Sequence, residues 1–321
     1  MVSERTIVGI DVSRDWLDGY CLTNGWRFRL PNTAAGHDEV IAQLGALPAA
    51  GLVVGFEATG GQEWALWAAL EAAGLDARQL PPVQIKAFAA SRGTRAKTDR
   101  IDAELIARFM AFRPEAGRRI PSKTSRILSA LTSKRAQIVE MRKRLLAQAK
   151  ARAKQAVPAG LEEMDDELKT LFSAQIQTLE RRIAEVIAGD VAAARKAALL
   201  RSIPGIGPVT AALLIGDMPE LGRMTSAQAA AMTGLAPIPH DSGALRGKRA
   251  IAGGRRHLRH VLFQAALVAA HHNPSLKTVA GRLRSHGKPH KVIIVAVARH
   301  LITTANAILK AGSPWQPQRS V

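Results

Sequence analysis

The first 112 residues constrain the fold most, because short β-rich runs and helical patterns alternate there in a defined order. Extended runs are predicted at residues 6–13, 18–22, 26–30, 52–57 and 77–80. Helical patterns occupy residues 35–47, 62–73, 82–91 and 99–112. Three strands followed by alternating helix and strand predict a mixed α/β layer fold for this part of the chain.

Acidic residues stand where two of these strands end and in the helix that follows. Asp11 comes directly after an apolar run, and Glu57 ends another. Asp99 and Asp102 are spaced i, i+3, which places both on one helical face. Ligand groups collect at strand ends in α/β sheets, and two divalent cations held by oxygen ligands favour phosphoryl transfer. Helix capping by Asp99 and a solvent-facing Glu57 are the structural alternatives.

The segment between the first two strands holds weaker candidates. Asp15 lies in a turn and Asp18 within a strand, so both rank below the four carboxylates above. Cys21 is the one cysteine, which excludes an intrachain disulfide and a cysteine-cluster zinc site. Its apolar surroundings predict a small core residue.

After Pro121 the sequence changes to long helical patterns. Apolar residues follow a heptad seam from Ile127 to Leu145, and a second run steps by threes and fours from Leu161 to Val186. A break at 158–160 separates the two runs. This pattern predicts a helical hairpin or a pair of coiled-coil arms. Such arms set an oligomeric state or separate two domains, although a bundle within one chain remains an equal alternative.

The charge of the chain is strongly positive and unevenly distributed. The formal net charge is +19, and from residue 222 onward the sequence has fifteen Lys or Arg and one acid, Asp241. A polyanionic partner is expected, because basic side chains that neutralise phosphates release counterions. A ribosomal-type protein and a basic membrane-surface protein are the alternatives. We expect a cytoplasmic protein with no membrane association, since no signal peptide is present and the runs at Val261–Ala270 and Val292–Ala298 are shorter than a membrane span.

A glycine-rich turn begins the basic part of the chain. Gly205 and Gly207 lie in the sequence Pro-Gly-Ile-Gly-Pro, ahead of an Ala/Leu-rich helix. This pattern matches a helix-hairpin-helix motif, in which backbone N–H groups at a helix N-terminus approach a phosphate regardless of base sequence. An ordinary turn between helices is the alternative.

A possible nucleophile lies in a predicted loop further on. Ser242 stands in the sequence His-Asp-Ser-Gly, where His240 and Asp241 precede it. A serine that attacks phosphorus needs an exposed hydroxyl and cations around the transition state. Asp-Ser-Gly is also a common turn sequence, so the serine alone does not distinguish a nucleophile from an ordinary turn residue. The basic residues that follow, a predicted phosphate-contacting surface, are Arg246, Lys248, Arg249, Arg255, Arg256 and Arg259.

Together these motifs resemble those of the insertion-sequence one-ten family of transposases. The N-terminal blocks of the resemblance are Gly9-Ile10-Asp11-Val12-Ser13, Phe56-Glu57-Ala58-Thr59-Gly60 and Lys97-Thr98-Asp99-Arg100-Ile101-Asp102-Ala103. Its C-terminal blocks are Pro204-Gly205-Ile206-Gly207, Gly234-Leu235-Ala236-Pro237 with Ser242-Gly243, and Gly254-Arg255-Arg256-His257-Leu258-Arg259. The blocks span nearly the whole chain in the order expected for the family. His240-Asp241 ahead of the serine departs from the usual pattern and leaves its role open.

The resemblance implies a fold, a chemistry and a set of partners. The N-terminal domain would be RuvC-like, of the RNase H type, with two Mg²⁺ ions on Asp11, Glu57, Asp99 and Asp102. Ser242 would be the nucleophile that joins covalently to DNA. A structured bridge RNA would pair with donor and target DNA, and dimers would assemble into a tetramer with composite active sites.

The sequence therefore predicts an α/β domain joined to an all-α part. The expected divisions are a catalytic domain at 1–121, coiled-coil arms at 122–198, a C-terminal transposase domain at 199–311 and a flexible tail at 312–321. A hydrolytic nuclease such as a Holliday-junction resolvase would need the carboxylates but no serine. A non-catalytic nucleic-acid-binding scaffold would need neither. A sugar-kinase-like ATPase is disfavoured because the chain has no glycine-rich phosphate loop of that class.

Overall fold

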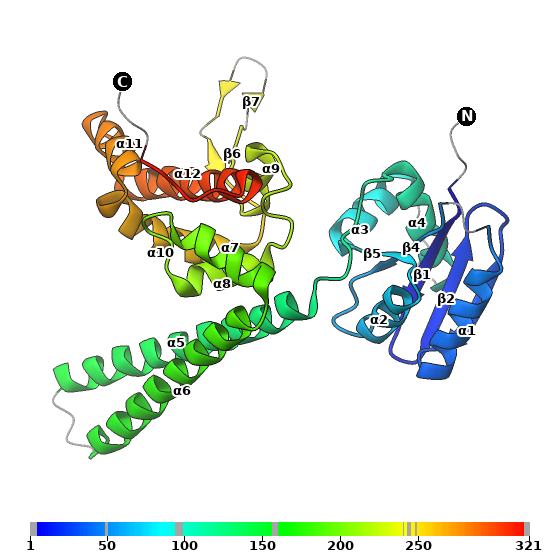
Figure 1. Cartoon of the computed structure of the whole chain (residues 1–321), viewed down its shortest axis with the longest axis horizontal. Coiled ribbons are helices and arrows are strands. Elements are labelled where there is room, and N and C mark those ends of the chain that lie inside the picture. The colour runs from blue at the N-terminus through cyan, green and yellow to red at the C-terminus, as the bar shows by residue number, and fades with distance from the viewer. Residues whose placement is uncertain are drawn as a thin grey trace. The chain divides into compact units, whose positions relative to one another are not determined.

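The chain forms two compact units, Met1–Ile120 and Pro121–Val321 (Figure 1). The computed structural model describes residues 5–48, 51–93, 99–155, 160–239, 241–242, 245–247 and 249–317. The side chains of residues 99–101, 241–242 and 245–246 lie outside that description. The first unit is α/β and the second is mainly helical, so the mixed α/β and all-α composition is confirmed.

The first unit is built on a five-stranded mixed sheet with the order β3-β2-β1-β4-β5. The first three strands are antiparallel, whereas β1, β4 and β5 are parallel. All five strands were predicted, and their bounds are β1 (Ile7–Val12), β2 (Trp16–Cys21), β3 (Arg27–Pro31), β4 (Val53–Glu57) and β5 (Asp76–Leu80). Cys21 is fully buried in the core, as predicted.

Helices cover both faces of this sheet. The four helices, all predicted, are α1 (Ala34–Gly45), α2 (Trp64–Ala72), α3 (Pro82–Ser91) and α4 (Asp99–Phe112). Val8, Ile10 and Val12 point from β1 into a core shared with α1 and α2. A second core joins β4 and β5 to α3 and α4. Because side chains alternate along a strand, Gly9 and Asp11 lie on the face that α4 covers.

Helix α4 sits directly on the sheet because two glycines leave room for it. Gly9 and Gly55 are paired across β1 and β4. A Cβ atom added at Gly9 would lie 2.6 Å from the backbone nitrogen of Ala107, and one at Gly55 would overlap the side chain of Met110. Glycine at both positions therefore brings the α4 backbone against the centre of the sheet.

The second unit begins with two long helices, α5 (Lys123–Lys154) and α6 (Glu162–Ala188), which lie side by side (Figure 1). The Arg135 guanidinium donates two hydrogen bonds to Glu180, and Arg152 pairs with Asp165 nearer the break between the helices. These hydrogen bonds and ion pairs between α5 and α6 show a helical hairpin within one chain. Supercoiling of the arms and assembly of chains through them stay predictions.

The rest of the second unit packs around α12 (His290–Ala311), which contacts α7 (Val191–Arg201), α9 (Ser226–Met232), α10 (Arg256–His272) and α11 (Pro274–Ser285). Helix α8 (Pro208–Asp217) packs on α5, α7 and α10. By length and composition α12 could cross a membrane, although the sequence runs had suggested shorter apolar segments. Its residues Val297, Leu301 and Ile302 are fully buried in the core, which accounts for its apolar character.

Two parts of the second unit differ from the sequence prediction. The predicted loop around Ser242 contains short strands, β6 (Pro237–Ile238), β7 (Asp241–Ser242), β8 (Leu245–Arg246) and β9 (Ala250–Ile251). Strands of two residues are too short to produce a periodic pattern, so they could not be predicted from the sequence. In the predicted flexible tail, Trp315 packs against the helical core and its backbone N–H donates to the Ser202 hydroxyl over 2.8 Å.

Candidate functional site

The sheet places Asp11 and Glu57 beside each other on the face that α4 covers. Parallel pairing of β1 and β4 runs up to Ile10 opposite Phe56, and Asp11 and Glu57 are the next residues of the two strands. Neighbouring strands lie about 4.8 Å apart, so the two acidic residues occupy neighbouring backbone positions at the carboxyl edge of the parallel pair. Both side chains are partly exposed. That the two carboxylates share a metal site stays a prediction.

Helix α4 adds acidic residues from above this edge. Asp102 is partly exposed and stands next to Ala103, whose carbonyl lies over Gly9. Asp99 is in the first turn of α4, as predicted, but its side chain is outside the described residues. Among the described side chains, no three acidic or histidine groups form a cluster that could hold a metal ion. The donor set is entirely carboxylate, which suits a hard divalent cation such as Mg²⁺.

Asp18 is closer to this site than the sequence indicated. It is paired directly with Asp11 across β1 and β2, so both side chains lie on the same face. Asp18 is 5% exposed, and an Arg29 nitrogen lies 3.6 Å from one of its carboxylate oxygens. Arg29 is the partner of Asp18 on β3 and lies near the ring of Trp16. A basic residue that pairs with Asp18 offsets the repulsion between two adjacent carboxylates.

A buried glutamate shapes the loop that follows Glu57. One oxygen of Glu63 accepts hydrogen bonds from the backbone and hydroxyl of Thr59 and from the N–H of Gly61. The other oxygen of Glu63 accepts a hydrogen bond of 2.6 Å from the Gln79 amide nitrogen, and Arg118 donates to the Gln79 oxygen. Burial raises the pKa of Glu63, but these hydrogen bonds outweigh it, so the pKa lies below its usual value. The ionised carboxylate therefore fixes the path of the chain just beyond Glu57.

The glycine-rich turn joins α7 to α8 as predicted. Gly205 has a φ of 105°, and a Cβ atom there would lie 2.5 Å from the side chain of Ala269 on α10. Gly207 caps α8 with nothing within 4 Å of its Cβ position, and the neighbouring Pro208 is exposed. Gly205 is thus required by packing and backbone conformation, whereas Gly207 leaves the N-terminus of α8 open. Phosphate binding at this turn stays a prediction.

Ser242 lies on a short hairpin that rises from the helical unit. Ser242 on β7 pairs with Leu245 on β8, and the β6–β9 pair continues the hairpin toward its base. The Ser242 and Arg246 side chains, together with His240 and Lys248, are outside the described residues. At the base, a Cβ atom at Gly254 would lie 2.6 Å from the Cα of Gly234. Only glycine at both positions, each with a φ of 65°, permits this crossing of two chain segments.

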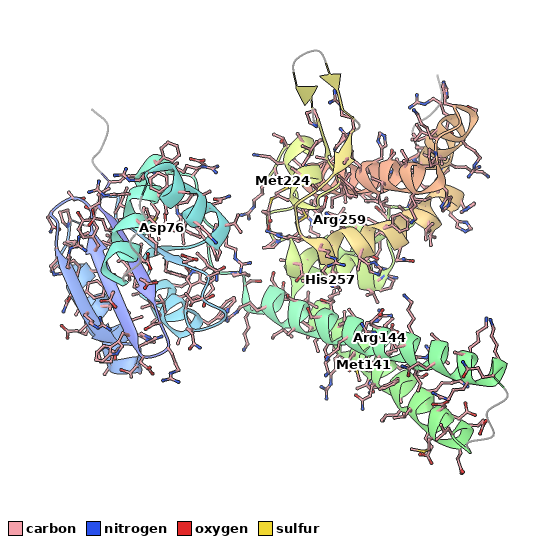
Figure 2. The ribbon with its side chains drawn as sticks, turned by 180° about the vertical axis from the view of Figure 1, so that it is seen from behind. Asp76, Met141, Arg144, Met224, His257 and Arg259 are labelled. Atoms are coloured by element: carbon pink, nitrogen blue, oxygen red, sulfur yellow. The ribbon has the colours of Figure 1, made fainter. Side chains whose placement is uncertain are left out.

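A basic groove of about 750 Å³ lies beside this base, between β9, α10 and α12. Figure 2 shows Arg259 on α10, near the base of the hairpin. Its guanidinium donates to the carbonyl of Gly253 over 2.7 Å. Phe263, Val292 and Val295 contribute an apolar lining, and none of the groove's described lining residues is acidic. The basic lining residues are Arg249, Arg256, Arg259, His260, Lys291 and Arg299.

Arg255 does not belong to this groove, contrary to its place in the predicted surface. Its guanidinium forms an ion pair of 2.5 Å with Glu220 and donates to the carbonyl of Asp217, the last residue of α8. These contacts join the start of α10 to the end of α8. Arg255 therefore has a structural role through Glu220 and the Asp217 carbonyl. A run of consecutive basic residues in the sequence could not reveal this role.

Sequence reasoning also missed the contribution of α12. Lys291 and Arg299 lie eight positions apart, with Val292 and Val295 between them on the same helical face. Residues at i, i+4 and i+8 share a face of a helix, so this spacing was the available signal.

Comparisons with known proteins agree with these features. Residues 8–158 match a family model of DEDD transposases of the IS110 type, and residues 197–280 match the transposase IS116/IS110/IS902 family. The chain is 29% identical to the pilin gene-inverting protein of Moraxella lacunata, over 97% of this chain and 98% of that protein. It is 34% identical to an uncharacterized 43.6 kDa protein of insertion element IS110 from Streptomyces coelicolor, over 37% of this chain and 30% of that protein.

The first family model covers the first unit from residue 8 and continues through α5, and the second falls within the second unit. The first model covers the sheet edge with Asp11 and Glu57, and the second covers the glycine-rich turn, the hairpin and α10. The similarity to the pilin gene-inverting protein runs through both units. The chain therefore belongs to the IS110 family of transposases, the insertion-sequence one-ten family that its sequence motifs resemble.

Proposed function

We propose that this transposase exchanges DNA strands through a covalent serine–DNA intermediate at a carboxylate-rich site. The observation that carries the proposal is the parallel register of β1 and β4, in which Asp11 and Glu57 each follow the last paired residues, on the sheet face covered by the helix that bears Asp99 and Asp102. Two Mg²⁺ ions bound by these carboxylates would supply Lewis acidity at the scissile phosphate. The donor chemistry supports such ions, and the register supports a shared site.

In the proposed reaction the Ser242 hydroxyl oxygen attacks phosphorus. The new bond joins the serine oxygen to phosphorus, while the bond from phosphorus to the 3′ oxygen breaks. The serine proton passes to a carboxylate or water, and the departing 3′ oxygen takes up a proton. Attack by another 3′ hydroxyl reverses these steps, releases the serine and joins the exchanged strands. Because each bond broken is replaced by an equivalent one, no high-energy cofactor is required.

The proposed partners are donor and target DNA together with a structured guide RNA. The groove between β9, α10 and α12 supports a polyanionic partner, because Arg256, Lys291 and Arg299 surround it and no acid lines it among the described residues. The inversion named for the relative from Moraxella lacunata is a DNA rearrangement of the kind this reaction would produce. We further propose a cytoplasmic protein that acts as dimers assembled into a tetramer.

Covalent trapping tests the serine step. Wild-type protein incubated with Mg²⁺ and donor DNA is expected to give a protein–DNA adduct that survives denaturing electrophoresis. Ser242→Ala should abolish the adduct while DNA binding, measured by fluorescence anisotropy, stays unchanged. Recombination by Ser242→Ala would refute the serine role. Mg²⁺-dependent strand cleavage without any adduct would instead favour a hydrolytic nuclease.

A second experiment tests the RNA partner and the enzyme class. Protein purified from cells that carry the full insertion element is expected to retain one structured RNA transcribed beside the gene, which sequencing would identify. Recovery of only unrelated cellular RNA would refute the guide. DNA binding with neither cleavage nor exchange would favour the non-catalytic scaffold.

A further inference from the structure

We propose that Asn32 is a positioning residue that joins the loop after β1 to the loop after β4, with His37 holding the Asn32 amide in place. The inference rests on the proposed role of Asp11 and Glu57 as metal ligands. It concerns what sets the separation of these two carboxylates, which the sheet alone does not determine.

The ladder between β1 and β4 stops just short of the carboxylates. Its last paired residues are Ile10 and Phe56, one position before Asp11 and Glu57. Asp11 stays in β1, where it pairs with Asp18 on β2, and Glu57 ends β4, where it pairs with Leu80 on β5. The two residues are therefore held on their outer sides but are not paired with each other. The spacing of the two acidic side chains across this gap therefore depends also on how the chain is held just after each strand, in the loop after Val12 and in the loop after Glu57.

The Asn32 side chain bridges the two loops. Its amide nitrogen donates to the carbonyl of Ser13, 2.8 Å away, and to the carbonyl of Gln62, 3.3 Å away. Ser13 lies two residues after Asp11, and Gln62 lies five residues after Glu57. A carboxamide nitrogen has two hydrogens, so one group satisfies one carbonyl in each loop. The Asn32 backbone N–H also donates to the carbonyl of Asp15, which fixes the main chain at this point.

His37 on α1 fixes the orientation of the amide. Its Nε2 atom lies 2.7 Å from the Asn32 side-chain oxygen. That oxygen can only accept, so Nε2 carries a hydrogen and donates. His37 is 5% exposed, and burial lowers the pKa of its imidazole while the nearby Asp38 raises it. With its oxygen held by His37, the amide must direct its two hydrogens toward Ser13 and Gln62.

Hydrogen bonds within the second loop connect Gln62 with the chain that follows Glu57. Glu63, next to Gln62, is 2% exposed and binds Thr59 and Gly61 within the same loop. A bond to Gln62 therefore restrains a loop that is already braced. Catalytic constellations require placement within about 0.5 Å. Loss of an outer-shell hydrogen bond made directly to a ligand lowers metal affinity by about 10–100-fold, and Asn32, which bonds the chain beyond the ligands, is expected to act at the lower end of this range.

Metal binding to the full-length protein separates positioning from a general contribution to stability. Titration calorimetry with Mn²⁺ alone measures affinity, and thermal unfolding without metal measures stability. Asn32→Ala is expected to weaken Mn²⁺ binding by up to about 10-fold with a modest loss of stability. Gln43→Ala on α1 is the control and should bind Mn²⁺ normally, because the half-buried Gln43 side chain donates to Glu39 over 2.6 Å and to no other side chain among the described contacts.

A pair of variants at His37 tests the bridge without altering Asn32. His37→Gln retains a donor for the Asn32 oxygen and should keep most of the Mn²⁺ affinity. His37→Phe removes the donor and should behave like Asn32→Ala. Wild-type affinity in both Asn32→Ala and His37→Phe, or equal losses in His37→Gln and His37→Phe, would overturn the positioning role.

The same titration distinguishes failure of the metal site from failure of the bridge. Asp11→Asn should abolish Mn²⁺ binding if the carboxylates are ligands. Wild-type protein that binds no Mn²⁺, or that binds it equally well with Asp11→Asn, would overturn the proposed metal site and the positioning role with it. Loss in Asp11→Asn but not in Asn32→Ala would overturn only the positioning role.

Discussion

Replacement of Gly9 by alanine tests the close contact between α4 and the sheet. The added Cβ atom would lie 2.6 Å from the Ala107 nitrogen, well inside van der Waals contact. Relief requires a shift of roughly 1 Å between two backbone segments, because no flexible side chain can yield. Overpacking of this kind costs about 1–3 kcal/mol, a large share of the stability of a domain of this size.

Urea unfolding followed by tryptophan fluorescence measures this loss in the full chain. Four of the five tryptophans, Trp16, Trp26, Trp64 and Trp67, lie in the first unit, so the signal reports mainly on it. A loss of about 2 kcal/mol lowers the urea midpoint by roughly 1 M. The control is Gly45→Ala at the end of α1, where the added methyl meets nothing within 4 Å. Equal midpoints for Gly9→Ala, Gly45→Ala and the wild type would refute the tight seating of α4.

The remaining predictions concern the basic residues and acid sensitivity. Arg255→Met should cost about 1–3 kcal/mol in thermal unfolding, because Glu220 and the Asp217 carbonyl lose a charged partner; wild-type stability would contradict the structural role of Arg255. Arg256→Met, on the groove, should leave stability unchanged and reduce by about one the slope of log binding constant against log salt concentration for DNA. An unaltered slope would exclude a phosphate contact. Burial lowers the pKa of His37 below 6.5, so the unfolded chain takes up a proton at a higher pH than the folded chain, and the first unit should lose stability as the pH falls from 6.5. His37→Gln should remove this part of the acid sensitivity. A pH profile of stability identical to that of the wild type would contradict the role of His37.

The elements of the first unit were predictable because each has a strong local pattern. Apolar alternation identified β1 and β4, and helix α4 was placed at residues 99–112 as observed. The division of helices between the two faces was not predictable, because it depends on contacts distant in sequence. The seating of α4 on Gly9 and Gly55 is such a contact: nothing near either glycine in the sequence shows that a helix lies above it.

The candidate site was only partly predictable for the same reason. Asp11 and Glu57 stood out because strand ends collect ligand groups. Asp18 was ranked low, since its pairing with Asp11 depends on the register of an antiparallel partner. Arg255 and Arg256 are adjacent and chemically alike, yet one holds α8 and α10 together and the other lines the groove. Only the direction of each side chain in the fold separates the two roles.

Anomalous diffraction from crystals soaked in Mn²⁺ tests the shared carboxylate site most directly. The account predicts a peak within coordination distance of both the Asp11 and Glu57 carboxylates, with further ligands from the start of α4. The peak should disappear in crystals of Asp11→Asn. A well-diffracting crystal with Mn²⁺ bound elsewhere, or with the Asp11 and Glu57 carboxylates directed away from each other, would contradict it.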